Sequence, residues 1–148
     1  MKILLIFLFY AVLFTSSAEG ATYGQKAVAA VILGEARGEG TKGMIAVAEV
    51  IRTRADAAHV TGLAIISQKR QFSCLNKTTI RGLLRKFEGK HPKWDEALRI
   101  SRVMYNTPEL LPGYTKGATH FTRKDERPYW ARGKKPVVTI NNHAFYRL

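Results

Sequence analysis

Apolar residues recur at intervals of three or four along most of the chain. This spacing matches the 3.6-residue period of an α-helix and places the apolar side chains on one face. Pro92 stands immediately before one such segment, at a position where the start of a helix tolerates proline. We therefore predict helices over residues 23–33, 41–55 and 93–105.

The pattern of apolar residues changes near the C-terminus. Residues 117–122 alternate in polarity, which favours a short β-strand. Two further apolar runs, 137–140 and 143–146, are separated by Asn141 and Asn142. Asparagine tolerates a positive φ, so this pair suits the tight turn of a β-hairpin. Helices followed by a small antiparallel sheet predict an α+β fold, and 148 residues suit a single compact domain.

Residues 34–40 interrupt the apolar pattern with two glutamates, one arginine and three glycines. Glu35 continues the apolar face of the preceding helix, so we expect its carboxylate to be carried toward the core. Burial disfavours the ionised form and raises the pKa of a carboxyl group, as a general acid working near neutral pH requires. Glu35 is therefore a candidate catalytic acid. The alternative is that it pairs with Arg37 or caps the next helix.

Glu39 follows Glu35 by four residues, so both would share one face of an unbroken helix. Gly38 and Gly40 make an unbroken helix unfavourable at this point. Two carboxylates on one helix face also point the same way, whereas the pair in a retaining glycosidase flanks the sugar. We expect Glu39 to be a charge at the start of the next helix, where the helix dipole favours an acid.

The N-terminus has the pattern of a secretory signal, in which a lysine precedes a short apolar run and then small residues. Ser16 and Ala18 would occupy the −3 and −1 positions of a cleavage site. We predict that residues 1–18 are a signal peptide and residues 19–148 the mature domain. Cleavage after Gly20, or an uncleaved signal-anchor, is the alternative. The predicted location is the periplasm, the cell wall or the extracellular space.

Lysine and arginine outnumber aspartate and glutamate by 24 to 11, giving a formal net charge of +13. For an exported domain, this charge favours an anionic cell-wall polymer as partner over nucleic acid. Cys74 is the only cysteine, so no intrachain disulfide is possible, and we expect a buried thiol. The usual nucleotide and zinc motifs are absent and the four histidines are scattered. We predict no cofactor and no metal site.

Five short segments occur in an order and at spacings typical of one family. They are residues 34–40, 46–54, 71–73, 117–121 and 143–147. Together they resemble the cell-wall hydrolases of the spore-cortex-lytic type, represented by SleB and its relative CwlJ. The similarity extends over nearly the whole mature chain. It implies a compact lysozyme-like domain that acts on peptidoglycan as a lytic transglycosylase, and the family's catalytic glutamate aligns with Glu35.

We expect a glycan-binding groove around Glu35. Aromatic rings stack on sugar faces, while amide and hydroxyl groups hydrogen-bond to the N-acetyl and hydroxyl groups of the glycan. The expected walls are Gln71, Phe72 and Ser73 on one side and His120, Phe121 and Trp130 on the other. Phe72 and Phe121 could equally belong to the core. Arg37 and Glu39 are expected beside the catalytic residue without touching the substrate.

A lytic transglycosylase needs one essential carboxyl group, which suits a chain in which Glu39 does not face Glu35. A hydrolase would need a second acid, and the candidates are Glu49, Asp56, Asp125 and Glu126. Two other functions stay open: a zinc-dependent N-acetylmuramoyl-L-alanine amidase and a non-catalytic basic module that binds the cell wall. We expect a monomer that acts on peptidoglycan glycan strands, whether it serves a bacterium or, like an endolysin, a phage.

Overall fold

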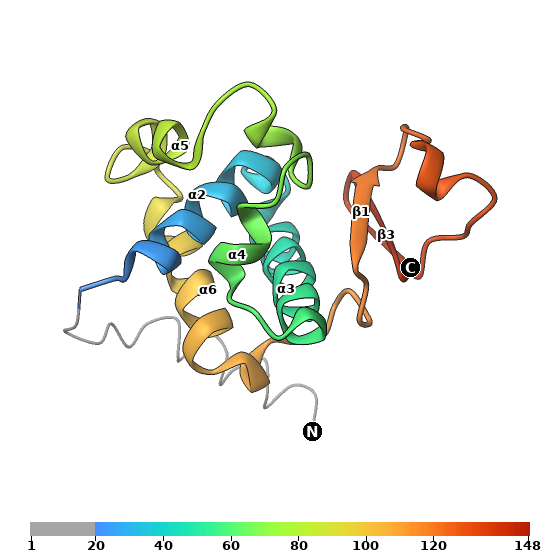
Figure 1. Ribbon diagram of the computed structural model, residues 1–148, viewed down its shortest axis with the longest axis horizontal. Coiled ribbons are helices and arrows are strands. Elements are labelled where there is room, and N and C mark those ends of the chain that lie inside the picture. The colour runs from blue at the N-terminus through green and yellow to red at the C-terminus, as the bar shows by residue number, and fades with distance from the viewer. Residues whose placement is uncertain (1–19) are drawn as a thin grey trace.

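The computed structural model describes residues 20–148 (Figure 1). The predicted signal peptide, residues 1–18, lies outside the described residues. The helices are α2 (Tyr23–Ala36), α3 (Gly40–Ala58), α4 (Gly62–Ile66), α5 (Ile80–Phe87) and α6 (Trp94–Asn106), with short 3-10 helices η1 (Ser73–Leu75), η2 (Pro108–Leu110) and η3 (Tyr129–Ala131). The strands are β1 (His120–Arg123), β2 (Val138–Ile140) and β3 (His143–Tyr146). The predicted α+β order, helices first and sheet second, is confirmed.

The central helix of the domain is α2. Thr22 and Gln25 begin it with a capping box, in which Thr22 Oγ1 accepts a hydrogen bond of 3.2 Å from the Gln25 N–H. Gln25 Oε1 in turn accepts one of 3.0 Å from the Thr22 N–H. Residues 27–33 are fully buried, because α3, α4, α5 and α6 pack around them (Figure 1). The sequence predicted that one apolar face of this helix is buried, whereas residues 27–33 are buried on every face.

Helix α5 was not among the predicted helices. Its sequence is rich in arginine and lysine, but Leu83, Leu84 and Phe87 are buried at helical spacing. Thr79 caps its start, since Thr79 Oγ1 accepts a hydrogen bond of 3.0 Å from the Gly82 N–H. Among residues 20–148, no helix is both long enough and apolar enough to cross a membrane.

The sheet has three antiparallel strands in the order β1-β3-β2. β2 and β3 form the predicted hairpin, and Asn141 in its turn has a φ of 52°. β1 begins three residues later than the predicted strand 117–122, because Lys116 and Gly117 have φ values of 53° and 75°. Extended strand backbone requires a negative φ, so β1 can start only after this turn.

The sheet packs against α3 through a small apolar cluster that includes Ala46, Val50 and Phe145. We call residues 20–111 the helical lobe and residues 118–148 the sheet lobe. Glu49, 4% exposed, fixes the segment that joins them. Its carboxylate accepts hydrogen bonds from the backbone N–H groups of Gly113, Tyr114 and Thr115, at 2.6, 3.0 and 2.8 Å, and from the Thr115 hydroxyl at 2.9 Å.

Candidate active site

A cleft of about 600 Å³ lies between the helical lobe and the sheet lobe. Residues far apart in the sequence meet there, because β1 stands beside α3 and the segment around η1 (Figure 1). The helical lobe contributes Glu35, Arg54, Gln71 and Ser73 to the lining, and the sheet lobe contributes His120, Phe121, Glu126, Trp130 and His143.

Glu35 lies in the last turn of α2, where the helix reaches the cleft. Its side chain is half-buried rather than carried into the core as expected, because the end of the helix opens to the cleft. The carboxylate accepts a hydrogen bond of 2.8 Å from the Cys74 backbone N–H. The Ser73 hydroxyl lies 3.2 Å from each carboxylate oxygen. Two donors from η1 therefore fix the orientation of this carboxyl group.

Gly34 allows η1 to approach α2 this closely. A Cβ atom at position 34 would lie 2.7 Å from Cys74 Cβ and 2.8 Å from Cys74 Sγ, which is closer than such atoms pack. The turn after α2 depends on another glycine, Gly40, which has a φ of 68°. The glycines of residues 34–40 thus serve two purposes: Gly34 gives room for Cys74, and Gly40 supplies the turn.

Glu39 occupies the N-cap position of α3, at the start of the helix as predicted. Its carboxylate accepts hydrogen bonds from the Asn142 backbone N–H at 2.9 Å and from the Asn142 side-chain amide at 3.2 Å. Partial desolvation favours a higher pKa, but these hydrogen bonds and the charges of His143 and Arg123 outweigh it and lower the pKa of Glu39. Glu39 therefore links the segment between α2 and α3 to the turn between β2 and β3.

Most of the predicted glycan-binding residues lie together in the cleft. Gln71, Ser73, His120, Phe121 and Trp130 all line it. The Trp130 and His120 rings are 5.2 Å apart between centroids, so they form one aromatic wall. Burial, followed by the charge of Arg54, lowers the pKa of His120. The imidazole therefore favours its neutral form at neutral pH.

Two predicted site residues lie elsewhere. Phe72 is 2% exposed and belongs to the core of the helical lobe, so the expectation that it lines the groove was wrong. Its backbone is extended, and side chains alternate sides in extended backbone, so Gln71 and Ser73 face the cleft while Phe72 turns inward. Arg37 is exposed, and its guanidinium donates to the Gly34 carbonyl at 3.4 Å rather than pairing with Glu35.

Several cleft residues were not predicted from the sequence. Arg54 donates hydrogen bonds to Gln68 and Gln71, at 3.0 and 2.6 Å between nitrogen and oxygen. Val50 also lines the cleft and precedes Arg54 by one helical turn on α3. This spacing places both residues on one face of the helix, which is the sequence signal that could have indicated Arg54. His143 is 7% exposed, and its Nδ1 has no hydrogen-bond partner among residues 20–148. Only the folded sheet brings His143 to the cleft.

The candidate second acids separate into two groups. Glu49 is enclosed by its four donors, and Asp56 pairs with Arg52 on α3 at 2.8 Å. Asp125 pairs with Arg123, and none of these three carboxylates lines the cleft. Glu126 does line it, from the sheet lobe, and accepts a hydrogen bond of 3.1 Å from the Thr122 hydroxyl. Glu126 is therefore the one predicted second acid that reaches the site.

The Cys74 thiol is partly buried beside Gly34 and Glu35. Burial, and then the charge of Glu35, raise its pKa well above the ordinary value, so the thiol stays protonated. Within the described part of the chain, no three histidine, cysteine, aspartate or glutamate side chains gather closely enough to hold a metal ion.

Comparison with known protein families identifies a family to which most of the chain is similar. Residues 38–146 match the model of a protein family described as Cell Wall Hydrolase. The matched range includes α3, η1 and all three strands, and it begins just after Glu35. Neither a search of curated proteins nor a search of solved structures gave a match.

Proposed function

The chain belongs to the cell wall hydrolase family, and from this premise we propose that it is a lytic transglycosylase of peptidoglycan. Its target would be the β-1,4 bond between MurNAc and GlcNAc. The observation that carries the proposal is the position of Glu35, a carboxyl group held by two donors inside a cleft between two lobes. The family match supports action on peptidoglycan, and the geometry of Glu35 supports its use as the acid.

In the proposed reaction, Glu35 begins protonated and gives its proton to the glycosidic oxygen as the bond to C1 breaks. The C6 hydroxyl of the same MurNAc then attacks C1, and the Glu35 carboxylate takes the proton of that hydroxyl. The products are a 1,6-anhydro-MurNAc end and a free GlcNAc 4-hydroxyl. The enzyme is returned with Glu35 protonated, and no water is consumed. Ser73 and Cys74 would keep the carboxyl group aimed at both oxygens in turn.

The remaining cleft residues would bind the sugars. Trp130 and His120 form an aromatic wall against which a sugar ring can stack. Gln71 is held by Arg54, so its amide is oriented before the glycan arrives, which reduces the ordering cost of binding. Phe121 is partly buried against the core and also lines the cleft.

Hydrolysis is the second candidate, and one observation favours it. Glu126 lines the cleft from the lobe opposite Glu35, which is where an inverting hydrolase would place the base that activates water. Glu39 also lines the cleft, but its two hydrogen bonds from Asn142 hold it toward the hairpin turn. The two reactions differ in their products, so a product analysis separates them.

The test is digestion of purified peptidoglycan sacculi by the wild type and by Glu35→Gln, followed by mass spectrometry of the products. We expect anhydro-muropeptides from the wild type and at least a hundredfold fewer from Glu35→Gln. Asp56→Asn makes the same carboxylate-to-amide change outside the cleft and should keep full activity.

The products also decide between the alternatives. Full activity of Glu35→Gln would rule out Glu35 as the acid. New reducing ends without anhydro sugars, lost in Glu126→Gln, would indicate hydrolysis. Released stem peptides, with activity lost in EDTA, would indicate an amidase, and binding without any products would indicate a wall-binding module.

We also propose that the enzyme works outside the cytoplasm, where its substrate lies. The predicted signal peptide supports this location. N-terminal sequencing of the exported protein should find a chain that begins at Glu19. Retention of the intact N-terminus in the membrane fraction would instead indicate a signal-anchor.

A further inference from the structure

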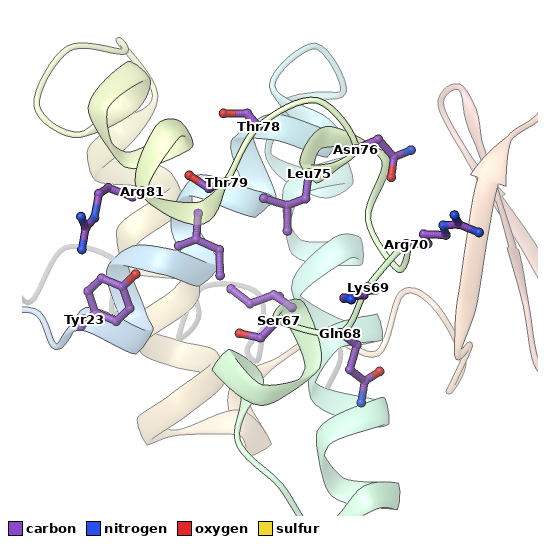
Figure 2. A pocket seen from close by; sticks show the side chains of 12 residues that line it. Tyr23, Ser67, Gln68, Lys69, Arg70, Leu75, Asn76, Thr78, Thr79 and Arg81 are labelled. Carbon is purple, nitrogen blue, oxygen red and sulfur yellow. The ribbon is translucent and has the colours of Figure 1, made fainter.

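A second groove, of about 1010 Å³, runs along the helical lobe beside the cleft (Figure 2). It lies between the start of α2, the segment from α4 to η1, and the start of α5. Tyr23 and Arg81 are at one end of the groove and Arg70 and Asn76 at the other (Figure 2). Arg70 and Asn76 also line the cleft, so the two sites adjoin.

The lining of this groove combines three kinds of side chain. Lys69, Arg70 and Arg81 supply positive charge, and no acidic residue is among the lining residues in the described chain. Ser67, Gln68 and Asn76 supply hydrogen-bonding groups, and Ile66, Leu75 and Ile80 supply apolar surface. Tyr23 adds an aromatic ring at the rim that is 56% exposed. The groove therefore offers cations, polar groups and apolar contact together.

We propose that this groove binds the acidic stem peptide carried by the glycan strand in the cleft. The inference rests on the proposed function, since it needs a peptidoglycan strand between the lobes. A stem peptide branches from MurNAc, and the shared residues Arg70 and Asn76 lie where such a branch would leave the cleft. Its free carboxylates would meet the three cations, and its amides would meet the polar side chains.

The apolar part of the lining favours a peptide over the other anionic polymers of a cell wall. A polyphosphodiester offers charge at each repeat but few groups that gain by covering Ile66, Leu75 and Ile80. A stem peptide offers alanine methyl groups for that surface. The bare glycan, in turn, presents one lactyl carboxylate for each MurNAc and no amide chain along the groove.

The experiment compares two substrates that differ in the peptide and in the lactyl carboxylate that its removal exposes. One is a preparation of peptide-bearing glycan strands, and the other is the same preparation after an amidase has removed the peptides. The variant Lys69→Gln/Arg81→Gln removes two charges from residues that line the groove but not the cleft. The control Lys134→Gln/Lys135→Gln removes the same charge from an exposed loop outside both sites.

Each exposed ion pair contributes modestly, so we expect the groove variant to raise KM for peptide-bearing strands about five- to tenfold. Its kcat, and its KM for stripped strands, should match the wild type. The control variant should match the wild type on both substrates. Thermal unfolding of all variants at the wild-type temperature would show that the substitutions leave the fold intact.

Three results would overturn the inference. Equal effects of the groove variant on both substrates would mean that Lys69 and Arg81 act without the peptide. Unchanged KM on both would mean that the groove does not bind substrate. Unchanged KM together with weaker binding to purified teichoic acid would assign the groove to a phosphodiester polymer. Failure of the proposed function is a separate outcome, because the wild type would then release no anhydro sugars from either strand preparation.

Discussion

The Glu35 carboxylate accepts a hydrogen bond of 2.8 Å from the Cys74 backbone N–H, although 39 positions separate the two residues. This contact exists because η1 lies directly on the end of α2. The close approach depends on the absence of a side chain at Gly34, where a Cβ atom would lie 2.7 Å from Cys74 Cβ. A glycine next to the candidate acid thus controls how the acid is held.

Gly34→Ala should therefore damage the site without changing any polar group. The new methyl group would push η1 away from α2 and weaken the contacts of Ser73 and Cys74 with Glu35. Overpacking of this kind costs about 1–3 kcal/mol of unfolding free energy. We expect a fall of at least tenfold in kcat with sacculi, and a lower Tm by calorimetry.

A second substitution tests the stated cause. Cys74→Gly removes the two atoms that lie too close to the new methyl group and keeps the backbone N–H that donates to Glu35. Gly34→Ala/Cys74→Gly should regain most of the activity lost in Gly34→Ala. If the double variant is as inactive as the single one, crowding at Cys74 is not the reason for the loss.

Glu39 should give the protein a stability that depends on pH. Its folded pKa lies below the ordinary value of 4.5, so its contribution is complete above about pH 4.5 and is lost as the pH falls through the lowered value. Glu39→Gln removes this contribution, which solvent screening limits to about 0.5 kcal/mol because most of the carboxylate faces water. Calorimetry should find the variant about 1–3 °C less stable at pH 7, and the difference in Tm should shrink as the pH falls below 4.5. A difference in Tm that stays constant with pH would contradict the assignment.

The fold could be predicted from the sequence further than the site. The periods of 3.6 and 2 predict α2, α3, α6 and the β2–β3 hairpin, because each pattern is local. Helix α5 was missed because its charged residues obscure three buried ones. The cleft depends on the packing of the sheet lobe against α3, which no local pattern contains.

The site residues show the same limit. Gln71, Ser73, His120 and Trp130 were expected to lie around Glu35, and the structure brings them together. The prediction for Phe72 was wrong because successive side chains point to opposite sides along extended backbone. Arg54 was not predicted in the cleft, since its contacts with Gln68 and Gln71 form only when α3 meets the segment before η1.

Glu49 should contribute to stability and not to chemistry. It is 4% exposed, and four donors from residues 113–115 depend on its carboxylate. Glu49→Ala leaves these donors without an acceptor, so we expect a loss of about 3 kcal/mol and a fall of about 10 °C in Tm. Glu49→Gln keeps one acceptor oxygen and should lose less. The kcat of folded Glu49→Gln at 20 °C should match that of the wild type. A hundredfold lower kcat would instead indicate that Glu49 takes part in the reaction.

The net charge of +13 should make wall binding depend on salt. Attraction between exposed lysine or arginine side chains and anionic wall polymers is screened over a Debye length, which falls from about 10 Å at 0.1 M to about 4 Å at 0.5 M. We therefore expect the fraction that sediments with nucleic-acid-free sacculi to fall several-fold between these salt concentrations. Sacculi stripped of their anionic polymers provide the control, and they should retain less protein at 0.1 M and show a weaker salt dependence. Equal retention at both concentrations would mean that contacts in the cleft, rather than charge, hold the enzyme on the wall.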